Sequence, residues 1–197
     1  MDDLKTTLTR YLDEQHEALL WKLDGLGEYD LRRPLTPTGT NLLGLVKHVA
    51  AVEAEYFGLV FDRPFPDAPT WLLDEDPPDN VDMWVTAEES TTSILDLFAR
   101  VRAHSAATIA ALDLDATGFV PWWGQGGVQV TLGRILVHVA VEAARHTGQA
   151  DIVRETIDSA AGLSDGNDNL PSHDDAWWRE YYDRVQGAAE QAARRTE

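Results

Sequence analysis

Four long stretches of the chain carry apolar residues at helical spacing, and this pattern limits the fold more than any other feature of the sequence. In the first stretch, Leu4, Leu8 and Leu12 follow one another at intervals of four, which places them on one face of a helix. Alternation with period two survives only over residues 128–130. The sequence therefore predicts an all-α fold with helices over about residues 3–26, 40–63, 86–112 and 131–157.

The starts of the later helices are marked by residues that cap helix N-termini. Thr40 and Thr131 each precede an apolar periodic run, and Thr86 is followed three positions later by Glu89 in a capping-box pattern. We expect Thr40 to open the second helix, Thr86 the third and Thr131 the fourth.

The segment from Pro64 to Val85 is predicted to be a long connection. It contains five prolines and five aspartates, a composition that no regular helix tolerates. Such a connection is the crossover expected between two parallel helices of a bundle. A polar loop over residues 162–175 then precedes a shorter fifth helix with Trp177 and Trp178. We therefore expect one domain over residues 1–197: a four-helix bundle with a long crossover loop and an additional C-terminal helix.

The composition argues against several classes of function. The formal net charge of −18 disfavours nucleic-acid binding, which depends on Lys and Arg contacts with phosphates. The N-terminus lacks a basic start followed by an apolar block, and no stretch has the roughly 18 consecutive apolar residues of a membrane helix. We expect a cytoplasmic protein that binds neither nucleic acid nor a membrane.

The absence of cysteine leaves His, Asp and Glu as the strong metal ligands of this chain. The fourth predicted helix places His138, Glu142 and His146 at successive intervals of four, hence on one face. With a rise of about 1.5 Å per residue, the two histidines lie about 12 Å apart along the axis, too far for one ion to bind both. The spacing leaves two alternatives, His138 with Glu142 or Glu142 with His146, each completed from another helix.

His48 is the best candidate for the ligand from a neighbouring helix, because apolar residues lie one turn to either side of it. His16, in the first helix, is the alternative. His104 lies among alanine and serine, and His173 lies in a polar loop, so both are predicted to be surface residues.

Two segments resemble the DinB-like superfamily, in particular the branch with mycothiol-dependent maleylpyruvate isomerase and mycothiol S-transferases. They read LRRPLTPTGTNLLGLVKHVAAVEAEYF and HVAVEAARHTGQADIVRE. The likeness is carried by the GLVKH run that ends at His48, by the E-x-x-x-H pair of Glu142 and His146, and by the run from Gly148 to Glu155.

The resemblance implies an up-down-down-up four-helix bundle whose metal is bound by His48, Glu142 and His146, with His138 outside the ligand set. Many members of the superfamily have histidine where this chain has Glu142. The chain therefore resembles the variant with two histidines and one glutamate.

Two histidines and one carboxylate leave open positions on a metal ion, as in catalytic zinc sites. Zinc is the expected ion, and iron, nickel or manganese are alternatives, since similar ligand sets bind several of these metals. The resemblance implies mycothiol as co-substrate, and zinc would lower the pKa of its thiol so that the thiolate attacks. Because the chain has no cysteine to carry a group, we predict a direct thiol S-transferase that acts on an electrophile, as in detoxification.

Two other functions remain open: a thiol-dependent isomerase of the maleylpyruvate type, and a non-catalytic bundle that binds a metal or another ligand. A di-iron site is excluded, because it needs two Glu-x-x-His motifs, whereas Glu142 and His146 are four positions apart.

Trp122 and Trp123 directly precede the fourth helix. They either wall the pocket for the electrophile or sugar, or plug the end of the bundle as apolar side chains. Arg145 points about 100° away from the metal-binding face and is predicted to lie at the surface or behind the ligands. The aromatic last helix suggests a homodimer interface.

Overall fold

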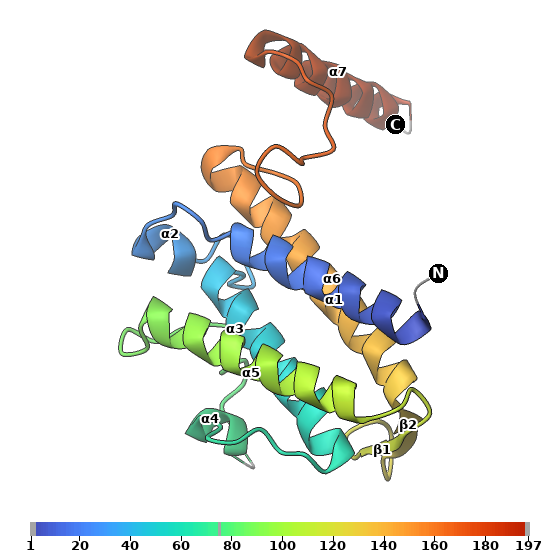
Figure 1. The fold of residues 1–197 in the computed structure, drawn as a ribbon. Coiled ribbons are helices and arrows are strands. Elements are labelled where there is room, and N and C mark those ends of the chain that lie inside the picture. Colours follow the sequence, from blue (N-terminus) through green and yellow to red (C-terminus); the bar gives the residue numbers. More distant parts are fainter. Residues whose placement is uncertain (1–2, 75, 196–197) are drawn as a thin grey trace. The chain divides into compact units, whose positions relative to one another are not determined.

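The computed structural model describes residues 3–74 and 76–195, and it forms two compact units that divide between Asn167 and Asp168. The described residues are mostly helical, as predicted, with a small antiparallel sheet beside the helices (Figure 1). No helix in these ranges is long and apolar enough to cross a membrane. The single domain over residues 1–197 stays a prediction.

The first unit is built on four long helices. They are α1 (Leu4–Trp21), α3 (Leu42–Glu53), α5 (Thr91–Ala111) and α6 (Leu132–Asp158). α3 continues directly into a π-helical turn, η1 (Ala54–Gly58), and a 3-10 turn, η2 (Leu59–Phe61). The short helices α2 (Glu28–Arg32) and α4 (Thr70–Leu73) lie in the connections, so the predicted crossover contains a helical turn. The second unit contains α7 (Asp175–Arg194), where the additional helix was predicted.

Short polar side chains cap the N-termini of α3, α5 and α6, but two of the three predicted cap residues are wrong. Thr131 caps α6 as predicted, because its hydroxyl accepts a hydrogen bond from the Arg134 N–H. The cap of α3 is Asn41 rather than Thr40, since the Asn41 side chain accepts from the Gly44 N–H. The cap of α5 is Ser90, so the capping-box residues predicted to open this helix form a separate turn before it. Extended backbone at each cap and a short polar side chain explain the observed starts.

The prediction of a purely α-helical chain is wrong at one place, a β-hairpin before α6. Its strands are β1 (Thr117–Val120) and β2 (Val128–Thr131), which pair antiparallel with Val120 opposite Val128. Strands of four residues are too short to produce a clear period-two pattern. Gly118 lets β1 pack closely on η2, because a Cβ there would lie 2.6 Å from the Val60 carbonyl oxygen. The hairpin loop carries the two tryptophans discussed below.

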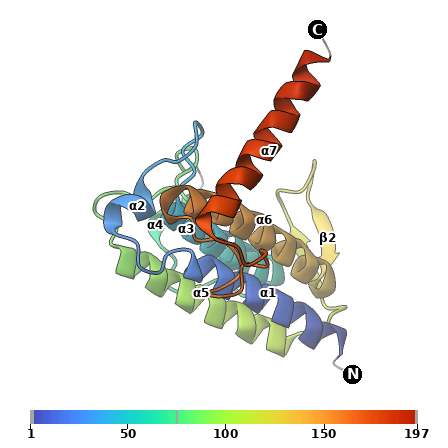
Figure 2. The same cartoon turned by 90° about the horizontal axis from the view of Figure 1, so that it is seen from above.

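The core lies between the long helices of the first unit (Figures 1 and 2). α3 packs against α5 and α6, and α1 packs against α6. The Lys5 ammonium donates to the Leu112 carbonyl, and Arg102 pairs with Glu17, so α1 and α5 run in opposite directions. Fully buried apolar side chains from α3 and α6 fill the centre: Leu42, Leu43, Leu45, Val46, Ile135, Leu136 and Val139.

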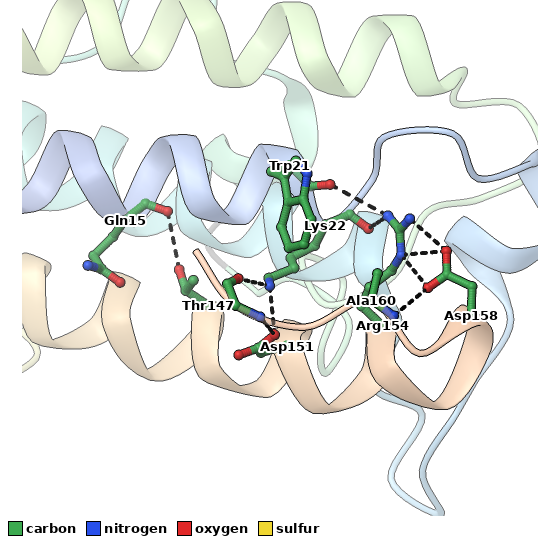
Figure 3. Close-up of polar contacts among 9 residues, drawn as sticks. Gln15, Trp21, Lys22, Thr147, Asp151, Arg154, Asp158 and Ala160 are labelled. Carbon is green, nitrogen blue, oxygen red and sulfur yellow. Dashed lines mark hydrogen bonds and ion pairs between the residues drawn. The ribbon is translucent and has the colours of Figure 1, made fainter. Parts of the chain in front are cut away.

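α1 ends at Trp21, short of the predicted end near residue 26, and the chain continues as a turn whose carbonyl groups are bound by Arg154 of α6 (Figure 3). The Arg154 guanidinium donates to the carbonyls of Lys22 and Asp24 and forms an ion pair with Asp158. These bonds satisfy acceptors that a helix C-terminus otherwise leaves unpaired. Further along, Thr147 donates to the Gln15 carbonyl. α1 and α6 therefore run in the same direction.

Replacing Arg154 by alanine is expected to lower the free energy of unfolding by about 2–4 kcal/mol, because buried charge-assisted hydrogen bonds are lost together. Denaturant unfolding followed by circular dichroism measures the loss. Arg100→Ala is the matched control, since Arg100 also has an ion-pair partner four residues away but its side chain is 46% exposed. The control is expected to cost less than about 1 kcal/mol, and equal losses for both variants would contradict the structural role of Arg154.

Candidate metal centre

The structure brings together three of the residues that the sequence singled out as metal ligands. His48 lies on α3, and Glu142 and His146 lie on α6. One potential ligand atom from each lies within 4.8 Å of the others. His146 Nε2 is 3.4 Å from a Glu142 carboxylate oxygen, and the two imidazole rings are 4.5 Å apart between centroids. Two nitrogen donors and one carboxylate therefore converge on a single small volume.

Opposite directions of α3 and α6 explain why these side chains meet. The His48 ring lies against His146, and two helical turns further along α3 and η1 the Tyr56 ring lies against His138 at 4.7 Å. Residue numbers thus rise along one helix as they fall along the other. Glu142 follows His138 by one turn and precedes His146 by one turn, so it lies beside the His48–His146 pair.

Both histidines are oriented by a partner at Nδ1. His48 Nδ1 donates to an Asp82 carboxylate oxygen at 2.6 Å, and His146 Nδ1 donates to the Gln149 side-chain oxygen at 2.8 Å. A proton on Nδ1 leaves the lone pair of Nε2 available for a metal. Sequence analysis missed both partners. Nothing in the spacing relates Asp82, in the crossover segment, to α3, whereas Gln149 follows His146 by three positions on α6 and could have been found from helical spacing.

The surroundings shift the pKa values of His146 and of Asp82, the partner of His48. Burial lowers the pKa of His146, and the nearby His48 lowers it further, so its imidazole stays neutral. The hydrogen bond from His48 lowers the pKa of Asp82, which keeps that carboxylate ionised as an acceptor. Neutral imidazole and ionised carboxylate are the states found around bound divalent metals.

The other histidines lie apart from these three. His138 packs against Tyr56 and Trp123. His16, the alternative ligand from the first helix, is buried in the core and pairs with Glu53. His104, predicted to lie at the surface, is half-buried beside Phe65. His173 is exposed as predicted and stacks on Trp177 in the second unit.

Trp122 and Trp123 lie in the loop of the hairpin and share one partner. Both indole N–H groups donate to the Tyr56 hydroxyl, at 3.1 Å and 2.8 Å. Trp122 is 43% exposed, whereas Trp123 is half-buried and packs against the core. Sequence analysis missed Tyr56, although it lies two helical turns after His48 on the same face. Arg145 is exposed, in keeping with the predicted surface position.

Comparison of the sequence with known protein families identifies the family of this chain. Residues 7–159 match the family model described as Mycothiol-S-transferase. The matched range contains both helices of the candidate metal centre and the hairpin. A search of curated proteins found no match. Because the family model covers well over half of the chain, the predicted resemblance is confirmed, and the chain belongs to the mycothiol-S-transferase family.

Proposed function

We propose that this protein is a metal-dependent S-transferase that joins mycothiol to an electrophile, and that His48, Glu142 and His146 hold its metal. The observation that carries the proposal is the convergence of the three donor groups within 4.8 Å, with each imidazole held at Nδ1. Membership of the family supports mycothiol as the thiol.

Zinc is the proposed ion, because two imidazoles and one carboxylate form the donor set of a catalytic zinc site with open positions. When bound, the ion lowers the pKa of a coordinating thiol and so favours the thiolate. Asp82 and Gln149 contribute by fixing the two imidazole rings. Trp122 and Trp123, anchored by Tyr56, are proposed to wall the side on which the electrophile binds.

We also propose that the four long helices form the up-down-down-up bundle of the DinB-like superfamily. The contacts described above support it, since α1 runs with α6 and against α5, and α6 runs against α3. The crossover from η2 to α5 then joins two helices of the same direction. A homodimer through the aromatic face of α7 stays a prediction.

The proposed activity is tested with metal-loaded protein, mycothiol and monochlorobimane, whose conjugate with a thiol is fluorescent. We expect the unmodified protein to conjugate the two compounds well above the uncatalysed rate. The His48→Ala variant should not exceed the uncatalysed rate. A rate equal to the uncatalysed one would refute the S-transferase. Turnover of maleylpyruvate without net conjugation would favour the isomerase instead.

His138→Ala is expected to leave the metal content unchanged. His138 lies two helical turns from His146, about 12 Å along the axis, and its ring packs against Tyr56 and Trp123. Elemental analysis after dialysis against a weak chelator gives the metal per chain. Loss of the metal from this variant would show that the ligand pair on α6 is His138 with Glu142.

A further inference from the structure

A pocket of about 320 Å³ opens beside His48, between α3 and the crossover segment. Its volume is at the lower end of the range for small-molecule sites. The walls come from α3 and η1 on one side and from α4 and the following segment on the other. The side chains that matter for recognition are His48, Glu55, Trp71, Asp74, Asp79 and Asp82.

The charged side chains that line the pocket are acidic. Glu55, Asp74, Asp79 and Asp82 line it, and none of its described lining residues is Lys or Arg. A carboxylate or phosphate on a ligand would meet the like charge of these side chains, which costs binding energy. Carboxylates accept hydrogen bonds, so they suit a ligand that offers hydroxyl groups.

Trp71 supplies a fixed aromatic wall of the same pocket. The Lys47 ammonium lies over its ring, 4.6 Å from the centroid. Lys47 itself is 1% exposed and is held by the Glu89 carboxylate at 2.9 Å and the Trp84 carbonyl at 3.1 Å. This buried, held ammonium favours one orientation of the indole. A flat apolar face beside hydrogen-bond acceptors is suited to a sugar ring, whose C–H groups pack on indole while its hydroxyls donate.

We propose that this pocket binds the uncharged polyhydroxy half of the thiol and that its carboxylates exclude thiols bearing carboxylates. The inference rests on the proposed function, because it takes the thiol end to lie at His48. Mycothiol carries a sugar and a cyclitol without ionised groups, whereas glutathione and bacillithiol carry carboxylates. The pocket would thus select among low-molecular-weight thiols by charge.

Binding of a sulfur-free ligand to metal-free protein tests the pocket separately from catalysis. The probe is N-acetylglucosaminyl-inositol, the sulfur-free disaccharide, titrated into metal-free protein by calorimetry. We expect saturable binding, weakened at least tenfold by Trp71→Ala. Trp84→Ala is the control, since this side chain is 51% exposed on the same segment and does not line the pocket. Absence of binding, or equal effects of the two variants, would overturn the proposal.

A second arm keeps the test valid if Trp71→Ala fails to fold. Asp74→Asn with Asp79→Asn removes two exposed charges from the pocket, and we expect kcat/KM for glutathione relative to mycothiol to rise about tenfold. Asp67→Asn makes the same chemical change on this segment outside the pocket, at a positive φ of 53° that Asn tolerates. An unchanged ratio in the double variant would refute charge selection. Disaccharide binding without S-transferase activity would refute the proposed function alone.

Discussion

Replacing His146 by alanine is expected to lower the affinity for the divalent metal at least about a thousandfold, beyond the 10–100-fold that loss of an outer partner costs. S-transferase activity should fall below detection with it. His146 supplies one of the three converging donors, and its Nε2 lies 3.4 Å from the Glu142 carboxylate. Without the imidazole, one histidine and one carboxylate remain, which is fewer protein ligands than catalytic zinc sites use.

Arg145→Ala is the control for this variant. Arg145 is the neighbouring residue on α6 and is exposed, so its loss should leave both metal content and folding unchanged. Metal per chain is measured by elemental analysis, and circular dichroism verifies that both variants are folded. Retention of the metal by His146→Ala would contradict the proposed ligand set.

Glu53→Ala is expected to lower the free energy of unfolding by about 3–5 kcal/mol, the largest effect on stability that the structure predicts. Glu53 is fully buried on α3 and pairs with His16 of α1, whose side chain is 3% exposed. Removing the carboxylate leaves the His16 imidazole without its hydrogen-bond partner in the core and opens a cavity. Chemical denaturation compares the variant with the unmodified protein.

A double-mutant cycle separates the pair from the packing around it. If His16 and Glu53 act as a pair, replacing both by alanine should cost much less than the sum of His16→Ala and Glu53→Ala. Metal content should stay unchanged throughout, because His16 lies outside the donor set. Additive losses would show that the two side chains act independently.

Helical periodicity predicted the four long helices because each buries one continuous apolar face, as Leu12 and Leu19 do in α1. The hairpin escaped prediction, since the pairing of Val120 with Val128 depends on contacts with η2 and not on a local pattern. Buried charges were also missed. Lys22 and Lys47 occur in helical sequence that resembles a polar surface, yet both are almost fully buried with carboxylate partners distant in sequence.

The sequence predicted the three candidate ligands but not the residues that form hydrogen bonds with them. The four-residue spacing placed Glu142 and His146 on one face, and the resemblance selected them with His48. The bond of His48 to Asp82 and the pairing of His16 with Glu53 depend on how segments meet in space. Spacing along the sequence carries no such information.

X-ray absorption at the zinc edge tests the central claim most directly. Zinc-loaded protein should show nitrogen and oxygen neighbours at about 2.0–2.2 Å, and mycothiol should add one sulfur at about 2.3 Å. The chain has no cysteine, so a zinc–sulfur distance of this kind that is absent before mycothiol is added would come from the thiol. A spectrum that gains no sulfur at saturating mycothiol would contradict the account.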